Sequence, residues 1–507
     1  MARVEKPVRL LVAALLLTAA APARAQDRPG EDSMFGAAAS TTTTPKAGPV
    51  QAERESRGDV SGLASAAGRD AFASGEVSDN PLQIGGIYYQ RWIASKLDGR
   101  APSHAPVSMP LQFDAFMDSR PSDRVRGYVQ GRLLYDATRD RFGGTTAGGG
   151  QGDLQTASTS GAPQTLPGGT TAAAQTPSNP QGVLDQAWLK FDIQRKVFVT
   201  AGKQHVKWGT SRFFNPTDFL STQRRDPLLP YDLRLGNTMA KFGMPLETKG
   251  GNLYAIVLAD NPQPGSTLGQ TGLAVRGERL FGPAEVGVEA VSRGNASPEY
   301  GADISAPLGP FDVYAEAAVQ TRSPVPRYRL TALPTPGADI STLYAADDSR
   351  GPFLQASGGG NYTFAWKDNR EATVGAEYFY NQLGYDKAAI YPVLIFLGGY
   401  QPFYTGKHYA AIYATAEGPD EAKHTSYTFS TIGNLSDGSF ISRLDFAWRF
   451  LTYLTFEAYG DEHYGTRGGE FRFELHTPAL VANGAAVRPI NLPATVYDVG
   501  MGLRLSF

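Results

Sequence analysis

The sequence predicts an all-β fold, namely a transmembrane antiparallel β-barrel of about 18 strands, with 16 to 20 possible. Three observations predict it: long runs of alternating apolar and polar residues, connectors that alternate between short and long, and an aromatic residue at the end of the chain. Runs of ~9–12 residues are long enough to cross a tilted bilayer, whereas strands in soluble sheets more often have about 5 or 6 residues. The short connectors would be periplasmic turns and the long ones extracellular loops.

The N-terminal part of the chain predicts export. A basic start is followed by the apolar stretch Leu10–Ala21, which is too short to span a bilayer, and by a small-residue cleavage pattern at Ala23–Ala25. Residues 1–25 are therefore interpreted as a signal peptide. Residues 26–80, rich in Ala, Thr, Ser and Gly, predict a disordered periplasmic segment. The barrel would occupy residues 81–507.

Alternation is clearest at the C-terminus, where apolar Tyr497, Val499 and Met501 are separated by Asp498 and Gly500. A period of two places these sets on opposite faces of one strand. A soluble β-sandwich would alternate as well, but strand length and loop order favour the barrel, whose closure leaves no exposed sheet edge. Comparable patterns predict strands at 124–136, 284–292, 311–320, 371–380, 440–449, 452–461 and 470–476.

The connectors follow the expected order in the first part of the chain. Short and long connectors alternate at Arg120–Ser122, 137–182, Gln194–Arg195 and 208–235. After residue 380 this order fails. The tight turn at Phe450–Thr452 and the long connector 477–495 cannot both lie on their expected sides unless one strand is missing or wrongly assigned.

The ladder of amphipathic strands and the terminal Phe507 resemble Gram-negative outer-membrane porins. That resemblance implies the outer membrane of a Gram-negative bacterium, contact with its lipid, and insertion by the barrel assembly machinery, which reads the terminal aromatic strand. A second, local resemblance covers 183–245. Gly202-Lys203-Gln204 with Trp208-Gly209, followed by Asn215-Pro216-Thr217-Asp218, is similar to a pattern of large porin-like barrels, including relatives of polysaccharide-export channels.

The polar face of each strand predicts the lining of the lumen, because an Arg or Lys on the lipid face near the midplane costs about 2–4 kcal/mol. Acidic side chains outnumber basic ones on this face, so the wall as a whole leans toward cations. Alternatively, opposite charges on neighbouring strands pair and brace the wall. The principal lumen-lining candidates are Arg124, Arg126, Arg132, Glu285, Glu289, Glu316, Glu377, Arg443, Asp445, Arg449, Arg472, Glu474 and Arg504.

Residues 203–226 combine basic and aromatic side chains. Strict parity would turn Lys203 outward, which predicts that the strand bulges or ends near Gly202. One hypothesis is that this segment folds inward as a basic, aromatic constriction, because charges at a constriction set ion preference. The other is an extracellular loop anchored at the headgroups by Trp208. The constriction candidates are Lys203, Lys207, Arg212, Asp218, Arg224 and Arg225.

Signals for catalysis are weak. The chain has no cysteine, no HExxH motif and no nucleophile elbow, and its six histidines lack metal-ligand spacing, so no enzymatic activity, metal or cofactor is expected. Asp461, Glu462 and His463 near a strand end are the runner-up. The apolar run Ile390–Leu397 could be a docking patch for apolar solutes, a strand, or a loop tucked into the barrel mouth.

The predicted function is an outer-membrane channel for polar solutes. It would be either a diffusion porin or an export conduit, such as for a secreted polysaccharide, with periplasmic export components as partners in the second case. The alternatives are a barrel-borne transporter of apolar solutes and an outer-membrane hydrolase. The near balance of 47 basic and 49 acidic residues gives no sign of a nucleic-acid partner. Solute, direction of transport, open or plugged lumen, and oligomeric state stay open.

Overall fold

The computed structural model describes residues 81–507 except 139–178, 222–223, 230–231, 247–249, 260–270, 295, 332–338, 340–342, 368–369, 398, 419–423, 478–479, 483–484 and 488–489. The expected signal peptide and N-terminal periplasmic segment lie outside the described residues. Within the described part, no helix is both long and apolar enough to cross a bilayer.

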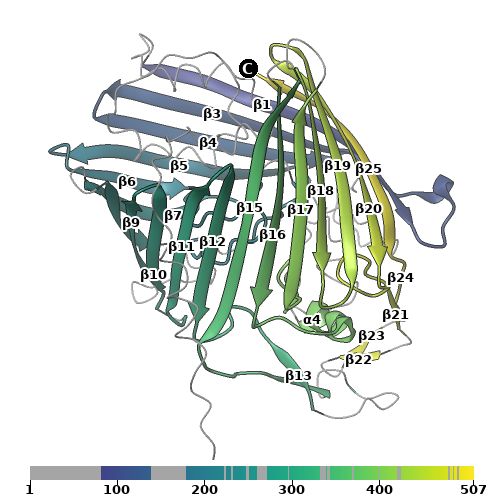
Figure 1. The fold of residues 1–507 in the computed structure, drawn as a ribbon. Helices are drawn as coiled ribbons and strands as arrows, with labels where there is room; N and C mark the ends of the chain where they lie inside the picture. Colours follow the sequence, from purple (N-terminus) through teal and green to yellow (C-terminus); the bar gives the residue numbers. More distant parts are fainter. Residues whose placement is uncertain are drawn as a thin grey trace, which may run out of the picture.

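Eighteen strands form one closed antiparallel barrel, which confirms the predicted fold class (Figure 1). Each strand pairs with its neighbours along the chain, and β1 pairs with β25 to close the barrel. The two-residue β2 (Val107–Ser108) adds to β1. The barrel strands are β1 (Leu82–Leu97), β3 (Pro110–Ser122), β4 (Val125–Asp136), β5 (Gln181–Ile193), β6 (Val197–Gln204), β7 (Asn237–Leu246), β8 (Gly251–Leu258), β9 (Gly272–Phe281), β10 (Ala284–Ser292), β11 (Glu299–Leu308), β12 (Phe311–Gln320), β15 (Phe353–Lys367), β16 (Arg370–Asn381), β17 (His408–Glu417), β18 (Thr425–Asn434), β19 (Ser439–Leu451), β20 (Leu454–Gly465) and β25 (Thr495–Ser506).

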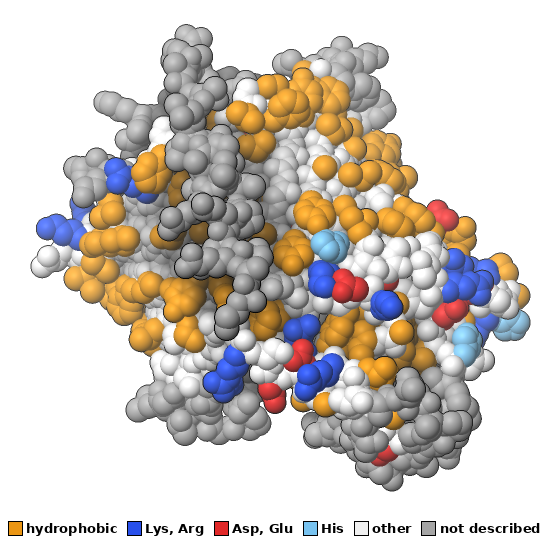
Figure 2. Space-filling view, turned by 60° about the horizontal axis from the view of Figure 1, so that its bottom comes forward, with side chains coloured by type: hydrophobic (Ala, Val, Ile, Leu, Met, Phe, Trp, Pro, Cys, Tyr) orange, Lys and Arg blue, Asp and Glu red, His pale blue; other side chains and the backbone are white. Residues whose placement is uncertain are grey.

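The outer surface of the barrel is apolar, as alternation predicts. Val288 of β10 is 56% exposed and Val499 of β25 is 60% exposed, while the inward neighbour Glu289 is buried. In Figure 2, hydrophobic side chains form broad areas of the surface, and Lys, Arg, Asp and Glu side chains stand in small separate groups between them. Apolar side chains exposed at every second position suit contact with lipid. The closed barrel also pairs the backbone N–H and C=O groups of the described wall strands with one another, so that these groups need no water within the bilayer. This outer surface is that of a barrel that spans a membrane.

The strand connections are sorted by length between the two ends of the barrel, except that the β18–β19 connection (435–438) is shorter than the β17–β18 connection (418–424) at the opposite end. The β5–β6 turn uses the left-handed residues Gln194 and Arg195, and the β9–β10 and β11–β12 turns use Gly282 and Gly309, each with a φ of 62°. These tight turns need positive φ, which glycine adopts without steric cost. In Figure 1 the C-terminus lies at the upper end, and the helix α4 (Tyr391–Leu397) lies at the lower end among the long connections.

The predicted strand over 470–476 is wrong. Residues 466–474 form a loop, and only the short β21 (Leu475–Thr477) follows, paired with β24 (Ile490–Leu492) outside the barrel wall. Arg472 and Glu474 therefore belong to a long connection and not to the lumen wall. Removing this strand restores the order of connections: β19 and β20 meet in a tight turn, and β20 and β25 are joined by a long loop.

The apolar run Ile390–Leu397 is helical and not a strand, and its residues Tyr391, Leu394 and Ile395 are buried. It forms the end of η5 (Ala388–Ile390) and then α4, and it packs against Phe473 and Leu475 of the long β20–β25 connection. Because its apolar residues are consecutive, they cannot all face one side of a strand, whereas a short buried helix covers them on several sides. The run thus joins the β16–β17 connection to the β20–β25 connection at one end of the barrel. The other short strands there are β13 (Tyr328–Leu330), β14 (Tyr344–Ala346), β22 (Leu480–Ala482) and β23 (Ala485–Val487).

Candidate functional site

The described part of the connection between β6 and β7 (205–221, 224–229 and 232–236) folds toward the polar inner face of the barrel; we call it the inward segment. It begins where β6 ends, at Gln204, two residues beyond Gly202. The segment reaches β12 and β16, which lie well around the barrel from β6 in Figure 1. Its attachment there depends on two carboxylates that the sequence marks only as lumen-lining.

The first carboxylate is Glu316 of β12, which is 2% exposed. Its Oε1 accepts hydrogen bonds from the backbone N–H groups of Thr210 and Ser211, and its Oε2 accepts one at 2.7 Å from the hydroxyl of Thr217. Charge-assisted hydrogen bonds of this kind are roughly twice as strong as neutral ones. Glu316 thus holds both ends of a turn of the inward segment against the wall.

The second carboxylate is Glu377 of β16. It accepts hydrogen bonds from three consecutive backbone N–H groups, those of Arg212 at 2.9 Å, Phe213 at 3.2 Å and Phe214 at 2.7 Å. The hydroxyl of Tyr314 on β12 donates a fourth at 2.8 Å. Without this carboxylate, the three N–H groups would be buried without partners, so one side chain fixes the path of the segment.

Aromatic packing reinforces this attachment. The ring of Phe214 stacks on Phe379 with centroids 5.0 Å apart, and Phe379 lies two residues from Glu377 on the same face of β16. Arg212 lies over the ring of Tyr413 on β17 at 3.9 Å. The buried cluster around them comprises Phe213, Phe214, Leu228, Phe379, Phe403, Tyr404, Tyr409, Ala411, Tyr413, Ile432, Ile441 and Phe471. The cluster joins the inward segment to the loops at the barrel mouth.

The near end of the segment is held by ion pairs. His205 Nε2 lies 2.9 Å from Asp185 on β5, which also pairs with Arg132 on β4 at 2.8 Å. Arg234 bridges Asp218 at 2.7 Å and Asp232 at 2.6 Å. Burial alone would raise the pKa of Asp232, but the Arg234 guanidinium, supported by that of Arg225, holds it well below its ordinary value. Asp232 therefore remains ionised and paired.

The constriction candidates other than Lys203 lie in the inward segment. Lys207, Arg212, Arg224 and Arg225 are half-buried in the inward segment, and Asp218 is buried in it. Arg224 lies over the ring of Tyr404 at 4.6 Å and donates to the carbonyl of Asn215 at 3.2 Å. Lys203 differs, because its register partners Ala187 and Thr238 place it on the outward face of β6. Trp208 is 1% exposed and packs with Val206 and Ala318.

Charges of the wall are extensively paired. Arg276 contacts Glu289 and lies 2.7 Å from Asp303, and Arg132 lies 3.1 Å from Asp114. Such pairs brace neighbouring strands, as the alternative interpretation of the wall charges predicts. Further pairs are Arg126–Asp118, Arg443–Asp445 and Arg504–Glu457. Glu285 and Arg449 are half-buried on the strands β10 and β19, while Arg124 sits in the β3–β4 turn, paired with Asp192.

The proposed catalytic group does not converge on one face. Asp461 and His463 of β20 are buried, whereas the intervening Glu462 is exposed on the opposite face. A strand forces this arrangement because successive side chains alternate. Glu462 therefore cannot act together with its two neighbours.

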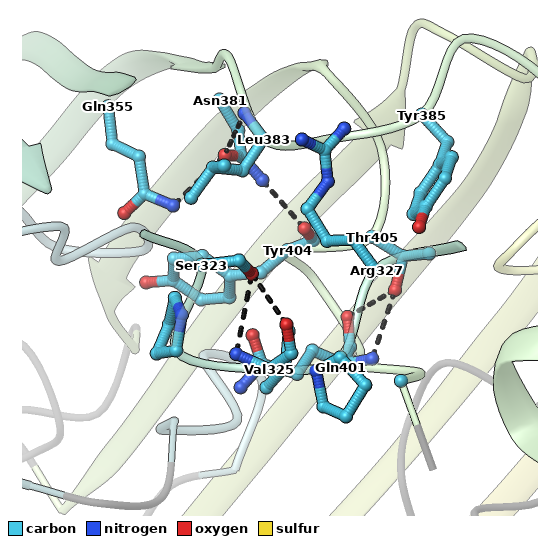
Figure 3. A pocket seen from close by; sticks show the side chains of 13 residues that line it. Ser323, Val325, Arg327, Gln355, Asn381, Leu383, Tyr385, Gln401, Tyr404 and Thr405 are labelled. Carbon is cyan, nitrogen blue, oxygen red and sulfur yellow. Dashed lines mark hydrogen bonds between the residues drawn. The ribbon is translucent and has the colours of Figure 1, made fainter. Parts of the chain in front are cut away.

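A small pocket lies among the long loops (Figure 3). Gln355 donates to Asn381 at 2.9 Å, and Asn381 donates to the carbonyl of Tyr404 at 2.7 Å. Arg327 and Tyr385 lie on its other side in Figure 3. These groups hold the β12–β13 connection beside the ends of β15 and β16, next to the inward segment.

No protein-family model matches the sequence, and no curated protein matches it. Solved structures with a similar fold include a triple mutant of the Rhodopseudomonas blastica porin (9% identity, 84% of this chain and 100% of that chain covered, TM-score 0.38). Acinetobacter baumannii OccAB1 is similar at 11% identity, with 84% and 96% covered and a TM-score of 0.48. Pseudomonas aeruginosa OccK11 is similar at 8% identity, with 84% and 96% covered and a TM-score of 0.44. Gram-negative outer-membrane porins are thus among the structures that this porin-like barrel is similar to.

Proposed function

We propose that this chain is an outer-membrane diffusion channel for small polar solutes, in which the inward segment narrows the lumen and favours anions. The observation that carries the proposal is the double attachment of the segment to Glu316 and Glu377 across a polar inner face. A polar lumen supplies the path, and a segment held inside it limits the size of what passes.

The same attachment favours small solutes over a polymer. An export conduit for a polysaccharide needs a wide, continuous path, so the inward segment would have to leave its position. Displacement would break the hydrogen bonds from Ser211, Arg212, Phe213 and Phe214 and expose an aromatic cluster. Each hydrogen bond to a charged group contributes about 1.5–3 kcal/mol, so displacement is costly. Polymer export therefore requires a large change that diffusion of small solutes does not.

The proposed anion preference rests on the cations of the inward segment. Wall carboxylates such as Glu289 and Asp303 pair with Arg276, and Glu316 and Glu377 are covered by the segment that they bind. Arg224 and Arg225 are half-buried on the segment, where they also act on Glu299 and Asp232, and they would place two cations at the narrow point. Cations at a narrow point raise the local concentration of anions.

Conductance in a planar bilayer tests the channel itself. The refolded full chain should give discrete current steps in KCl and release small polar solutes from liposomes, while excluding a polysaccharide. A barrel that folds but carries no current, or that shows hydrolase activity or uptake of apolar solutes in place of current, would overturn the proposal.

Charge reversal tests the ion preference. Under a KCl gradient, the reversal potential of the native chain should indicate anion preference, and Arg224→Glu/Arg225→Glu should shift it toward cations. The matched control is Arg279→Glu, since Arg279 is exposed near the β9–β10 turn. An unchanged reversal potential in the double variant would contradict the assignment of the constriction to Arg224 and Arg225, but it would not contradict the channel function.

A further inference from the structure

A second group of side chains converges on the inner face where β20 meets β25. Asp461 and His463 are two residues apart on β20 and therefore share a face. Asp498 on β25 is the direct register partner of Asp461. Sheet geometry thus brings two carboxylates and an imidazole together from positions that are far apart in the sequence. Their ligand atoms all lie within 4.8 Å of one another.

The orientation of His463 is fixed from outside this group. Its ring is 1% exposed, and Nδ1 lies 2.6 Å from the carbonyl oxygen of Phe471. A carbonyl only accepts, so Nδ1 carries a hydrogen. In the neutral imidazole, Nε2 then presents a lone pair toward the two carboxylates, all of them acceptors. Metal-bound histidines show this same arrangement, with the far ring nitrogen donating to a carbonyl.

The two distances from His463 Nε2 match those between neighbouring ligands of one metal ion. His463 Nε2 lies 3.4 Å from Asp498 Oδ2 and 3.5 Å from Asp461 Oδ1. Charge-assisted N–H···O bonds are shorter, about 2.7–2.9 Å. Ligand bonds of ~2.0–2.2 Å at a tetrahedral zinc ion place neighbouring ligand atoms roughly 3.3–3.5 Å apart. The buried Asp498 Oδ1 has no hydrogen-bond partner, so this carboxylate has capacity to spare.

The surrounding charges leave room for a cation. Arg443 lies 3.5 Å from Oδ2 of Asp461, which leaves Oδ1 facing His463. Arg443 is in turn neutralised by Asp445 at 2.8 Å. Asp461 and Asp498 therefore supply two negative charges that a divalent ion would balance. One nitrogen and two oxygen ligands suit a first-row transition metal better than Ca²⁺ or Mg²⁺, which prefer oxygen alone.

We propose that Asp461, His463 and Asp498 form a binding site for a divalent transition metal, with Zn²⁺ the best fit. Three protein ligands leave a fourth position for water. The ion would cross-link β20 to β25, the strand that closes the barrel on β1. Through the bond from His463 to Phe471, it would also hold the long β20–β25 loop in the mouth. This site is independent of the proposed channel function.

Zinc binding to the refolded, metal-stripped full chain tests the site. Titration should show one Zn²⁺ bound per chain, and Co²⁺ in its place should give the visible absorption of a tetrahedral nitrogen and oxygen site. Asp498→Asn and His463→Gln should each weaken Zn²⁺ binding at least about a hundred-fold, because each removes a direct ligand. His476→Gln, at an exposed histidine of the same loop, should bind like the native chain.

Folding is checked separately by the heat-dependent gel mobility of the barrel, and only folded variants enter the comparison. If both ligand variants fail to fold, competition decides: the native chain should take up Zn²⁺ from a chromophoric chelator, and excess Ca²⁺ should not displace that Zn²⁺. Native protein that binds no Zn²⁺, folded ligand variants that bind it as tightly as the native chain, or tighter binding of Ca²⁺ would each overturn the proposal.

Discussion

Phe214 is attached to β16 twice: its backbone N–H donates to the carboxylate of Glu377 at 2.7 Å, and its ring stacks on Phe379, two residues further along the same strand. The carboxylate satisfies the backbone, and the ring excludes water from it. A buried charged acceptor is effective only where water is excluded, so the two contacts support each other. This relationship positions the inward segment.

Replacing Glu377 should therefore open the lumen. In Glu377→Gln, an amide N–H₂ at the position of Oε2 faces the backbone N–H of Arg212, so that hydrogen bond is lost, and the remaining bonds lose their charged acceptor. A loss of roughly 3 kcal/mol changes the population of the attached segment by on the order of a hundred-fold. We expect larger and noisier single-channel conductance. Glu371→Gln, at an exposed position of the same strand, is the control; equal conductance in both variants contradicts the role of Glu377.

Arg276 should be essential to barrel stability. Its removal leaves Glu289 and Asp303 buried without their cation. Breaking a buried pair in this way typically costs about 3–5 kcal/mol. Arg276→Leu should lower the free energy of unfolding of the reconstituted barrel by that amount, which appears as a lower urea midpoint. Arg279→Leu, at an exposed position of β9, should change the midpoint little. Equal midpoints would show that these carboxylates find other partners.

The cost of a charge on the outer face should depend on depth. Val288 lies in the middle of β10, and Leu308 lies at the turn end of β11; both are exposed. An Arg near the midplane costs about 2–4 kcal/mol and one near the interface about 0–1 kcal/mol. Val288→Arg should therefore destabilise the barrel in lipid more than Leu308→Arg. The difference in stability between the two variants should vanish in detergent micelles. If Leu308→Arg were the less stable variant in lipid, the assignment of Val288 to the bilayer midplane would be wrong.

The mouth of the barrel should lose stability as pH rises. Burial, followed by the charge of Asp437, raises the pKa of Glu470 in the β20–β25 loop from 4.5 to about 8. Between these values the folded loop holds a proton that the unfolded chain releases, so stability falls from about pH 5 to pH 8. The thermal midpoint should follow this slope, and Glu470→Gln should flatten it. Glu474→Gln is the control, and a slope unchanged in Glu470→Gln refutes the assignment.

The terminal residue should matter for closure. Phe507 exchanges two backbone hydrogen bonds with Gly86 of β1, at 2.9 and 3.1 Å, and its ring stacks near Phe113. Phe507→Ala keeps the backbone bonds but removes the ring at the seam. Its folded yield in the outer membrane should fall several-fold by heat-dependent gel mobility, while Leu505→Ala, on the lipid face of the same strand, should fold nearly as well as the native chain.

Strand existence follows from sequence because the two-residue period is a local property. β10 and β12 begin and end at the residues that alternation predicts, 284–292 and 311–320. Residues 470–476 alternate as well but form no barrel strand, because their side chains pack among the loops at the barrel mouth. There Phe471 packs on Phe403 and Glu470 accepts from Tyr409. Alternation predicts which side chains share a face, but it does not predict whether that face is buried within a loop or belongs to a strand of the barrel wall.

The sequence by itself determined the barrel, its lipid-facing belt and the polar lining, since all three depend on neighbours along one strand. Only the tertiary structure decided how the carboxylates are used. Glu377 meets Phe214 across 163 positions of sequence, and Asp461 meets Asp498 across the strand that closes the barrel. A carboxylate carries the same local signal whether it faces water, an arginine, a metal or three backbone N–H groups. Only the tertiary structure decides which of these partners each carboxylate meets, because the partners come from distant parts of the sequence.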